Sequence, residues 1–446
     1  MTVAYVDPSS NIRDEIASGS GMPELPEKIW FHKTASAVID AGRCIGCGGC
    51  IAACPSRSIG VADDGKPTLI KMCTGCSACW DYCPLAGLRV ERLTKLLSDE
   101  LTDSQAFPVV GDGQGENELG EFGVSAASSV TTNFRRPFIG GSDSLGRVSS
   151  AYSSRAISKA AGAQDGGVVT GIVAALMKAG EIDGAILAKK HDAFRSSPFL
   201  ATSVEEVLGS AGSVYHQSHP LSILNQSLPA GVRRLAYVGT PCQISVLRAL
   251  QKYPWQYRDT AAGAVVVTIA LFCTRSFDPD SLEEAVRLSG VDTSSVSRLD
   301  IREGQLIAQD GLGVELLNSP VRRFSAAGLI GCEECLDFAG LNADIAIGNV
   351  GSERGRSSVL VRSEIGERMI ESAASSLTLE ILDDLTPISG IADQDRKRAE
   401  KTSARGIDSD GALWISYGEH LARYSGTDRS PKAPPGYRSY HFDVSC

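Results

Sequence analysis

A cysteine pattern that occurs twice near the amino terminus constrains this chain more than any other feature. Residues 44–55 read CIGCGGCIAACP and residues 73–84 read CTGCSACWDYCP, so both have the spacing C-x2-C-x2-C-x3-C followed by proline. In this spacing three thiolates of a tight loop bind one cubane, and the fourth thiolate reaches across to the other cluster. The repeat predicts two [4Fe-4S] clusters, one bound by Cys44, Cys47, Cys50 and Cys83 and the other by Cys73, Cys76, Cys79 and Cys54.

A pair of zinc knuckles and a disulfide framework are the alternative uses of these cysteines. Zinc sites usually combine two CxxC pairs and do not repeat this longer spacing with a proline after the fourth cysteine. The first 15 residues lack the basic start and apolar run of a secretion signal. The cytosol keeps thiols reduced, so the 13 cysteines of a cytoplasmic protein indicate metal binding rather than disulfides, with Cys446 expected to be a free surface thiol. Peripheral attachment to a membrane complex is left open.

Charge and hydropathy exclude two classes of partner. The net charge of −10 opposes nucleic acid as the main partner, because phosphate binding needs a basic face. No run of 18 or more apolar residues is present, so no transmembrane segment is expected.

Composition divides the chain into five segments. We expect a short α+β ferredoxin-like module, with two strands around a turn at Asp64-Gly65, and then an α/β domain with a mixed sheet. A stretch rich in Gly, Ser, Asp and Glu separates the two and is expected to be a linker. The expected segments are an N-terminal arm (1–40), the ferredoxin-type domain (41–94), the linker (95–144), the α/β domain (145–405) and a C-terminal extension (406–446).

Alternating helical and strand patterns define the α/β domain. Helical spacing predicts helices in 166–180, 204–212 and 241–253, the last with proline in its first turn. Short apolar runs predict strands in 182–190, 233–240, 262–273 and 343–348, the last followed by a glycine turn. The region after residue 352 is expected to be helical and charged.

Four later cysteines form a second constellation: Cys242, Cys273, Cys332 and Cys335. Two of them follow predicted strands, where an open α/β sheet gathers its ligand site. Four thiolates meeting there would suit a further iron–sulfur cluster. Free cysteine is also a common core residue, so spacing alone leaves both interpretations open.

Three segments, AQDGGVVTGIVAALMKAGEIDGAILAKK, YVGTPCQISVLRAL and GCEECLDFAGLNADIAIGNVGS, resemble the beta subunit of coenzyme F-420-reducing hydrogenase. They equally resemble its relatives in F-420H2 dehydrogenases and F-420-linked formate dehydrogenases, in a wider family that includes ferredoxin-dependent reductases of the chlorophyll pathway. The resemblance extends from about residue 145 to residue 404. It implies FAD beside a third [4Fe-4S] cluster held by Cys242, Cys273, Cys332 and Cys335.

The resemblance also implies which segments surround FAD. These are the QDGG segment and the glycine- and serine-rich stretch 209–218. The predicted cofactor-binding residues are Gln164, Asp165, Gly166, Gly167, Thr170, Ser210, Gly212, Ser213, Tyr215, Thr240 and Gln243. No catalytic residue is assigned.

Charge and backbone chemistry agree with a flavin site. Gly166 and Gly167 precede a predicted helix whose first N–H groups could receive a pyrophosphate. Lys189 and Lys190 could attract phosphates or the acidic tail of coenzyme F-420, or could form a solvated strand end. The absence of G-x-G-x-x-G argues against an NAD-type fold. Lone histidines such as His191, His216 and His219 are more often packed residues than catalysts.

These features together predict an iron–sulfur flavoprotein oxidoreductase. A deazaflavin exchanges only hydride and clusters pass single electrons, whereas FAD can do both. We therefore expect hydride transfer between coenzyme F-420 and FAD, and electron transfer through the clusters to a redox partner of ferredoxin, hydrogenase, dehydrogenase or heterodisulfide reductase type. The alternatives are a ferredoxin-dependent reductase of a pigment-like or other organic substrate, and a non-catalytic electron-transfer subunit.

Overall fold

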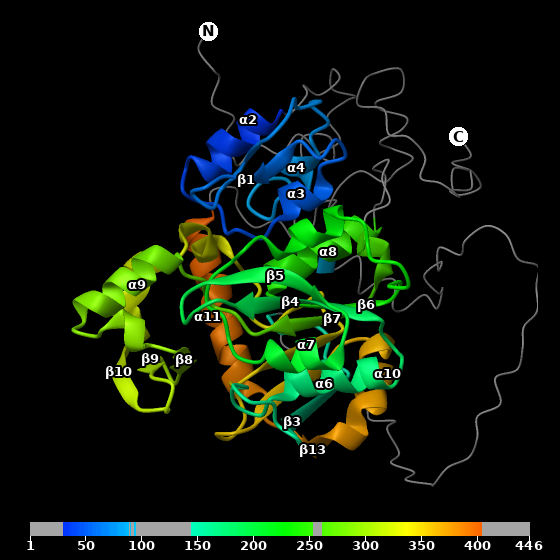
Figure 1. The fold of residues 1–446 in the computed structure, drawn as a ribbon, viewed down its shortest axis with the longest axis vertical. Coiled ribbons are helices and arrows are strands. Elements are labelled where there is room, and N and C mark those ends of the chain that lie inside the picture. The colour runs from blue at the N-terminus through cyan, green and yellow to red at the C-terminus, as the bar shows by residue number, and fades with distance from the viewer. Residues whose placement is uncertain (1–29, 89, 91–92, 95–143, 253–260, 404–446) are drawn as a thin grey trace, which may run out of the picture.

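A cysteine-rich module lies against a larger α/β domain, from which a small lobe projects (Figure 1). The computed structural model describes residues 30–88, 90, 93–94, 144–252 and 261–403. The N-terminal arm up to residue 29, nearly all of the expected linker and residues 404–446 lie outside the described residues.

The cysteine-rich module consists of short elements around the two motifs. Strands β1 and β2 pair antiparallel, with Ile59 opposite Leu69, which confirms the predicted hairpin. Helices α3 and α4 each contain the third cysteine of a motif, and each follows a residue with left-handed backbone, Gly48 or Ser77. The elements are α2 (Phe31–Thr34), the π-helical turn η1 (Ala35–Ile39), α3 (Gly49–Ala53), β1 (Ile59–Val61), β2 (Pro67–Leu69) and α4 (Ala78–Asp81).

An eight-stranded mixed sheet forms the centre of the α/β domain, as the sequence predicts. Its order is β13-β3-β12-β11-β7-β6-β4-β5, with parallel pairing among the four strands from β11 to β4 and antiparallel pairing elsewhere. The strands are β3 (Ser150–Ala156), β4 (Gly184–Lys190), β5 (Ser196–Ala201), β6 (Leu235–Gly239), β7 (Val265–Leu271), β11 (Ile345–Gly348), β12 (Ser357–Val361) and β13 (Leu377–Ile381).

Helices cover both faces of this sheet, so its strands carry apolar residues on alternate faces. On one face, α6 and α10 pack on Ile269 and Ile345. On the other face, α8 and α11 share a core with Ala270 and Ala346. The helices are α6 (Val168–Lys178), α7 (Val204–Gly209), α8 (Pro241–Lys252), α10 (Glu364–Ala373) and α11 (Thr386–Thr402), with shorter turns η2 (Pro220–Asn225), η3 (Ala261–Ala264) and η7 (Ala374–Ser376).

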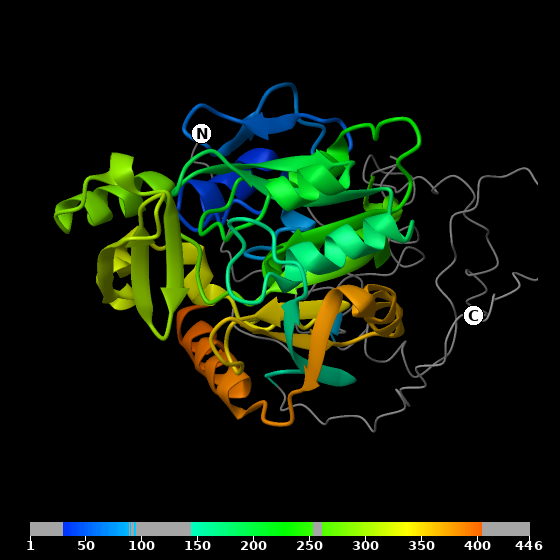
Figure 2. The same cartoon turned by 60° about the horizontal axis from the view of Figure 1, so that its bottom comes forward.

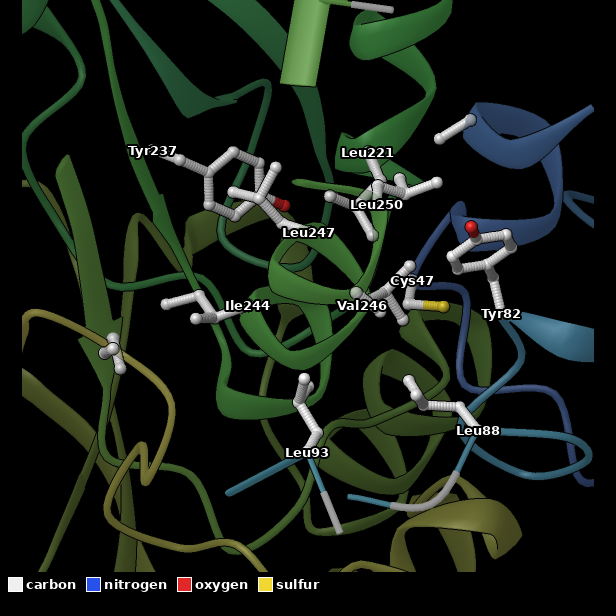
Figure 3. Close-up of a cluster of buried hydrophobic side chains, with 14 of the residues drawn as sticks. Cys47, Tyr82, Leu88, Leu93, Leu221, Tyr237, Ile244, Val246, Leu247 and Leu250 are labelled. Atoms are coloured by element: carbon white, nitrogen blue, oxygen red, sulfur yellow. The ribbon is translucent and has the colours of Figure 1, made fainter. Parts of the chain in front are cut away.

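The same core continues into the cysteine-rich module. Figure 3 shows Cys47, Tyr82 and Leu88 of the module on the side of α8 that carries Val246 and Leu250. All of these side chains are buried. The module and the α/β domain therefore share one hydrophobic core, which holds them in one arrangement.

The expectation of a helical region after residue 352 is wrong in part. Two helices, α10 and α11, are present, but β12 precedes them and β13 lies between them. Strand β12 is a short buried run that pairs with both β3 and β11. Its conformation follows from those distant partners, which a local pattern does not contain.

The projecting lobe is a feature that the sequence patterns did not predict. It has a three-stranded antiparallel sheet and its own core, which includes Leu282, Leu299 and Phe324, and it stands beside the main sheet in Figure 2. Its elements are α9 (Pro279–Leu288), η4 (Thr293–Ser295), β8 (Arg298–Arg302), β9 (Gln305–Gln309), β10 (Glu315–Pro320) and η5 (Val321–Ala327), followed by η6 (Ile330–Glu334). In the part of the chain that the structure describes, no helix has the length and apolarity of a membrane span.

Candidate redox centre

The four cysteines predicted for the first cluster lie together, and we call them the proximal group (Cys44, Cys47, Cys50 and Cys83). Burial and then the charges of Cys47 and Cys44 raise the pKa of the Cys50 thiol. Burial and then Cys83 likewise raise the pKa of Cys47. Such thiols are neutral unless a metal ion stabilises the thiolate, because a coordinated thiol loses its proton. This grouping of buried, neutral thiols is typical of a metal-cluster site and not of a reactive nucleophilic cysteine.

The second set, Cys54, Cys73, Cys76 and Cys79, is here called the distal group and lines a small cavity. Burial raises the pKa of Cys76, and the nearby Cys54 thiol adds to this. Thr34 Oγ1 lies 3.3 Å from Cys79 Sγ, within hydrogen-bond distance. Both predicted sets of four cysteines are therefore brought together, each with one member from the opposite motif.

Backbone N–H groups point at the sulfur atoms of both motifs. Gly46 N donates to Cys44 Sγ at 3.5 Å, and Gly75 N donates to Cys73 Sγ at 3.4 Å. These two glycines occupy the same position in each motif and have φ of +65° and +70°, where a Cβ is disfavoured. Hydrogen bonds of this kind stabilise a thiolate and tune the potential of a cluster.

Among the described residues, no three Cys, His, Asp or Glu side chains converge as ligands of a single metal ion do. A cubane binds each thiolate through a different iron, so its four ligands stand around a larger body. The grouped but separate thiols match that second arrangement.

A third group consists of Cys242, Cys273, Cys332 and Cys335, here called the domain group. Cys242 begins α8 after β6, Cys273 follows β7, and Cys332 lies in η6 with Cys335 directly after it. Burial, followed by the charge of Cys332, raises the pKa of Cys273 to about 12. Burial and then Cys335 raise the pKa of Cys242. The carboxyl ends of two parallel strands thus bring together cysteines that the spacing alone could not unite.

The proximal group neighbours each of the other two. Cys79 of the distal group acts on the pKa of Cys50, and Cys47 of the proximal group acts on that of Cys242. The buried Tyr237 lies near the second of these junctions, because burial, Cys47 and Cys242 together raise its pKa. The proximal group therefore stands between the other two.

Thr240 and Gln243, both predicted to bind a cofactor, border the domain group. Thr240 Oγ1 lies 3.2 Å from Cys242 Sγ. Gln243 Oε1 accepts hydrogen bonds from Tyr237 Oη and from Thr240 N, both at 3.1 Å, and its amide nitrogen donates to Gln217. Both ends of the buried Gln243 side chain are thus used within the protein.

The QDGG segment and the glycine- and serine-rich stretch meet. Gln164 accepts a hydrogen bond from Ser213 N at 3.0 Å and donates to Leu299 O at 2.8 Å. Gly212 has φ of +120°, and a Cβ there would lie 3.0 Å from Lys190 Nζ. These contacts gather two loops, the end of β4 and strand β8 into one region.

The start of α6 is formed by two glycines. Gly167 caps the helix at φ +65°, and no side chain caps the first turn, in which Thr170 is half-buried. A Cβ on Gly166 would lie 2.6 Å from Ser154 O, so only glycine fits. The first N–H groups of a helix are an anion site when nothing else accepts from them.

Other predicted positions have structural contacts. Ser210 Oγ donates to Val207 O at 2.7 Å and so closes α7. Tyr215 Oη accepts a hydrogen bond from Ile301 N of strand β8 at 2.9 Å, so this side chain connects its loop to the lobe. Burial raises the pKa of Tyr215. Lys189 is exposed, whereas burial lowers the pKa of the half-buried Lys190, with Arg298 adding to the effect.

Charged residues of the lobe were missed by the sequence analysis. Arg302 pairs with Asp165 at 3.0 Å and with Asp300 at 2.6 Å, and Arg298 lies 3.9 Å from Asp300. The signal was present, because residues 298, 300 and 302 share one face of a strand. His216 and His219 are packed, whereas His191 is exposed: the His216 ring accepts from Ser196 N, and His219 Nε2 lies 2.7 Å from Gly65 O.

Comparisons with known proteins agree with these observations. Residues 36–84 match the 4Fe-4S dicluster domain, residues 151–225 match the N-terminal model of the coenzyme F-420 hydrogenase/dehydrogenase beta subunit, and residues 232–384 match its C-terminal model.

Relatives share most of the chain. An uncharacterised protein of Methanocaldococcus jannaschii is 28% identical over 388 residues, 84% of this chain and 97% of its own. One of the subunits of the F-420H2 dehydrogenase of Methanosarcina mazei is 27% identical, over 71% of this chain and 86% of its own. A chain in the xenon-derivatised F-420-reducing [NiFe] hydrogenase complex of Methanosarcina barkeri superposes with a TM-score of 0.55 at 27% identity, covering 58% of this chain and 92% of that chain. The chain belongs to the family of coenzyme F-420 hydrogenase/dehydrogenase beta subunits and has an amino-terminal 4Fe-4S dicluster domain.

Proposed function

We propose that this protein is a flavin-dependent iron–sulfur oxidoreductase that exchanges hydride with coenzyme F-420 and single electrons with a partner protein. In this proposal each of the three cysteine groups binds a [4Fe-4S] cluster. The observation that carries it is the adjacency of the groups: Cys47 of the proximal group belongs to the core against which Cys242 of the domain group packs.

The order of the groups gives the order of electron transfer. The domain group lies at the carboxyl edge of the parallel strands, where α/β domains bind their ligands. The distal group neighbours the proximal group, with which it shares a small apolar cluster. Electrons therefore move between the sheet edge and the partner through the proximal group, in either direction.

The region around Gly166 and Gly167 is the proposed FAD site. FAD would supply the chemistry that connects hydride exchange with single-electron transfer. The uncapped start of α6 and the cations Lys190, Arg298 and Arg302 fit the diphosphate of such a cofactor. The exposed Lys189 is proposed to attract the acidic tail of coenzyme F-420.

The family supports a place in a larger assembly. One relative is named as a component of F-420H2 dehydrogenase, and the similar solved chain belongs to a hydrogenase complex. We propose that the partner is likewise a redox protein or a complex subunit, and that it exchanges electrons with the distal group.

Anaerobic reduction by reduced coenzyme F-420 tests this function. The purified, reconstituted chain is expected to contain about twelve irons, from three cubanes, and one FAD. Reduced F-420 should bleach both the flavin and the cluster absorbance. A Cys335→Ser variant is the matched control: it should keep the flavin and lose cluster bleaching.

Other outcomes would contradict the proposal in distinct ways. If FAD and iron are present and only reduced ferredoxin bleaches the flavin, the chain is a ferredoxin-dependent reductase of another substrate. If no FAD is retained at saturating FAD, the chain is an electron-transfer subunit without hydride chemistry.

A further inference from the structure

The loop that carries the proximal group is held between two elements of the α/β domain. On one side, the segment that leads into η2 binds its backbone: His219 N donates to Gly46 O at 2.8 Å and Leu221 N donates to Cys47 O at 3.3 Å. Asn225 Nδ2 adds a bond to Ile51 O at 2.9 Å. This side is fixed by backbone contacts and by the core that α8 shares with the module.

On the other side stands a buried ion pair between Arg43 and Glu334. Arg43 Nε donates to Glu334 Oε1 at 2.6 Å, and Arg43 Nη2 donates to Oε2 at 2.8 Å. The exposed fractions of the two side chains are 9% and 6%. Arg43 also donates to Ala37 O at 2.8 Å and to Leu85 O at 3.0 Å. The guanidinium fork is thus bound in one orientation, which a lysine could not reproduce.

The position of this pair in the sequence connects two cysteine groups. Arg43 directly precedes Cys44, and its bond to Leu85 reaches the segment that follows Cys83, so it contacts both ends of the proximal group. Glu334 lies between Cys332 and Cys335 of the domain group. A shift of either partner therefore moves cysteines of one group relative to the other.

The neighbouring glutamate has a different role. Glu333 pairs with Arg275 and with Arg398, both within the α/β domain. Of the two glutamates of this CxxC loop, only Glu334 is paired with the cysteine-rich module among the described residues. A buried pair gives little net stability compared with apolar residues of the same volume, but it can specify one arrangement.

We propose that Arg43 and Glu334 are a positioning pair that sets the distance between the proximal cluster and the cluster of the domain group. This inference rests on the proposed function for the identity of the clusters. Electron tunnelling slows steeply as the distance between redox centres grows, so the pair sets how fast electrons cross between the module and the α/β domain. The surrounding backbone bonds keep the module attached when the pair is lost.

The test compares Glu334→Gln and Arg43→Lys with the double variant Arg43→Gln/Glu334→Gln in the full, cluster-loaded chain. The matched control is Arg287→Gln, which breaks an exposed Arg287–Glu284 pair on α9. The first readout is the magnetic interaction between dithionite-reduced clusters in electron paramagnetic resonance spectra, which requires no F-420. The second is hydrogen–deuterium exchange of the amides in 44–51, and the third is the rate of cluster reduction after flavin reduction.

We expect Glu334→Gln to weaken the magnetic interaction between clusters, to accelerate exchange in 44–51, and to slow the second reduction phase severalfold, because tunnelling rates fall exponentially with the distance between clusters. Arg43→Lys should retain part of each property, and the control should match the wild type. The iron content of every variant is measured first. If Glu334→Gln is unstable, the charge-free double variant and Arg43→Lys give the same comparison.

Wild-type magnetic interaction and wild-type exchange in the loaded Glu334→Gln chain, or in the double variant, would overturn the positioning role. Failure of reduced F-420 to reduce the wild-type flavin would contradict the proposed function alone. The dithionite and exchange measurements would still decide whether the pair positions the clusters.

Discussion

Replacement of Gly48 by alanine should separate the cysteine-rich module from the α/β domain. Gly48 has φ of +81°, and a Cβ there would lie 2.8 Å from His219 O and 3.0 Å from Ser222 N. Both neighbours are backbone atoms, which cannot turn aside as a side chain can. The two residues just before Gly48 accept the bonds that hold the proximal loop, Gly46 O from His219 N and Cys47 O from Leu221 N.

The size of the effect follows from two terms. A left-handed conformation costs an alanine about 1–2 kcal/mol. Forcing extra volume into a packed interface costs typically another ~1–3 kcal/mol. Gly48→Ala should therefore reduce the free energy of unfolding by about 2–5 kcal/mol, the sum of these terms.

Gly65→Ala is the matched control. Gly65 has φ of +76°, and a Cβ there would meet nothing within 4 Å. This variant should show the conformational cost alone, about 1–2 kcal/mol. Gly65 contacts the α/β domain through its carbonyl oxygen, 2.7 Å from His219 Nε2, but an added Cβ does not alter that carbonyl and meets no atom. The difference between the two variants therefore isolates the steric contact at Gly48.

Anaerobic urea unfolding of the cluster-loaded chain measures both variants, with cluster absorbance as the signal. Gly48→Ala should also increase hydrogen exchange in 217–225, whereas Gly65→Ala should leave that segment unchanged. Equal destabilisation of the two variants, with unchanged exchange in 217–225, would refute the argument that backbone contact at Gly48 holds the module.

Three further outcomes are expected. Cys76→Ser should lower the iron content from about twelve to about eight per chain and abolish transfer to an external acceptor, while F-420 still reduces the flavin and the remaining clusters; iron analysis and stopped-flow absorbance check this. Lys190→Met should weaken FAD binding by about tenfold, as expected for the loss of one charge-assisted contact of about 1.5 kcal/mol, and Lys189→Met should leave it unchanged, as measured by fluorescence titration. Burial lowers the pKa of Lys190 in the folded chain. Between that lowered pKa and about 10.5, the unfolded chain binds more protons than the folded chain, so the free energy of unfolding of the FAD-free chain should rise with pH. Thermal unfolding of Lys190→Met should show no such rise over this pH range.

The sequence predicted best the elements whose signals are local. The parallel strands β4, β6 and β7 are short buried apolar runs, and α8 begins at a proline, so both types could be recognised without their partners. The two cysteine motifs had a spacing specific enough to assign each fourth cysteine to the opposite set. These features are encoded within about a dozen consecutive residues, the scale on which such patterns operate.

Features that depend on distant partners were not predictable in this way. Strand β5 contains Pro198, and this proline is tolerated because β5 lies at the edge of the sheet. Only the order of the strands reveals that β5 is an edge strand. Arg43 and Glu334 are 291 positions apart, and no local sequence pattern around either residue indicates that the two pair. The lobe was missed because its strands are short and polar, although Arg298, Asp300 and Arg302 alternate on β8.

The shared core couples cluster binding to the arrangement of the cysteine-rich module against the α/β domain. Cys47 is itself a member of the core that joins the module to α8, together with Leu221 and Ile244. A cluster bound by Cys47 would therefore stabilise the buried loop and, through it, the contact surface of the α/β domain, since metal binding and folding are coupled in such sites. Loss of iron from the proximal group should consequently loosen the junction with the domain group as well. At the proximal group, cluster occupancy, interface packing and electron transfer thus depend on the same residues.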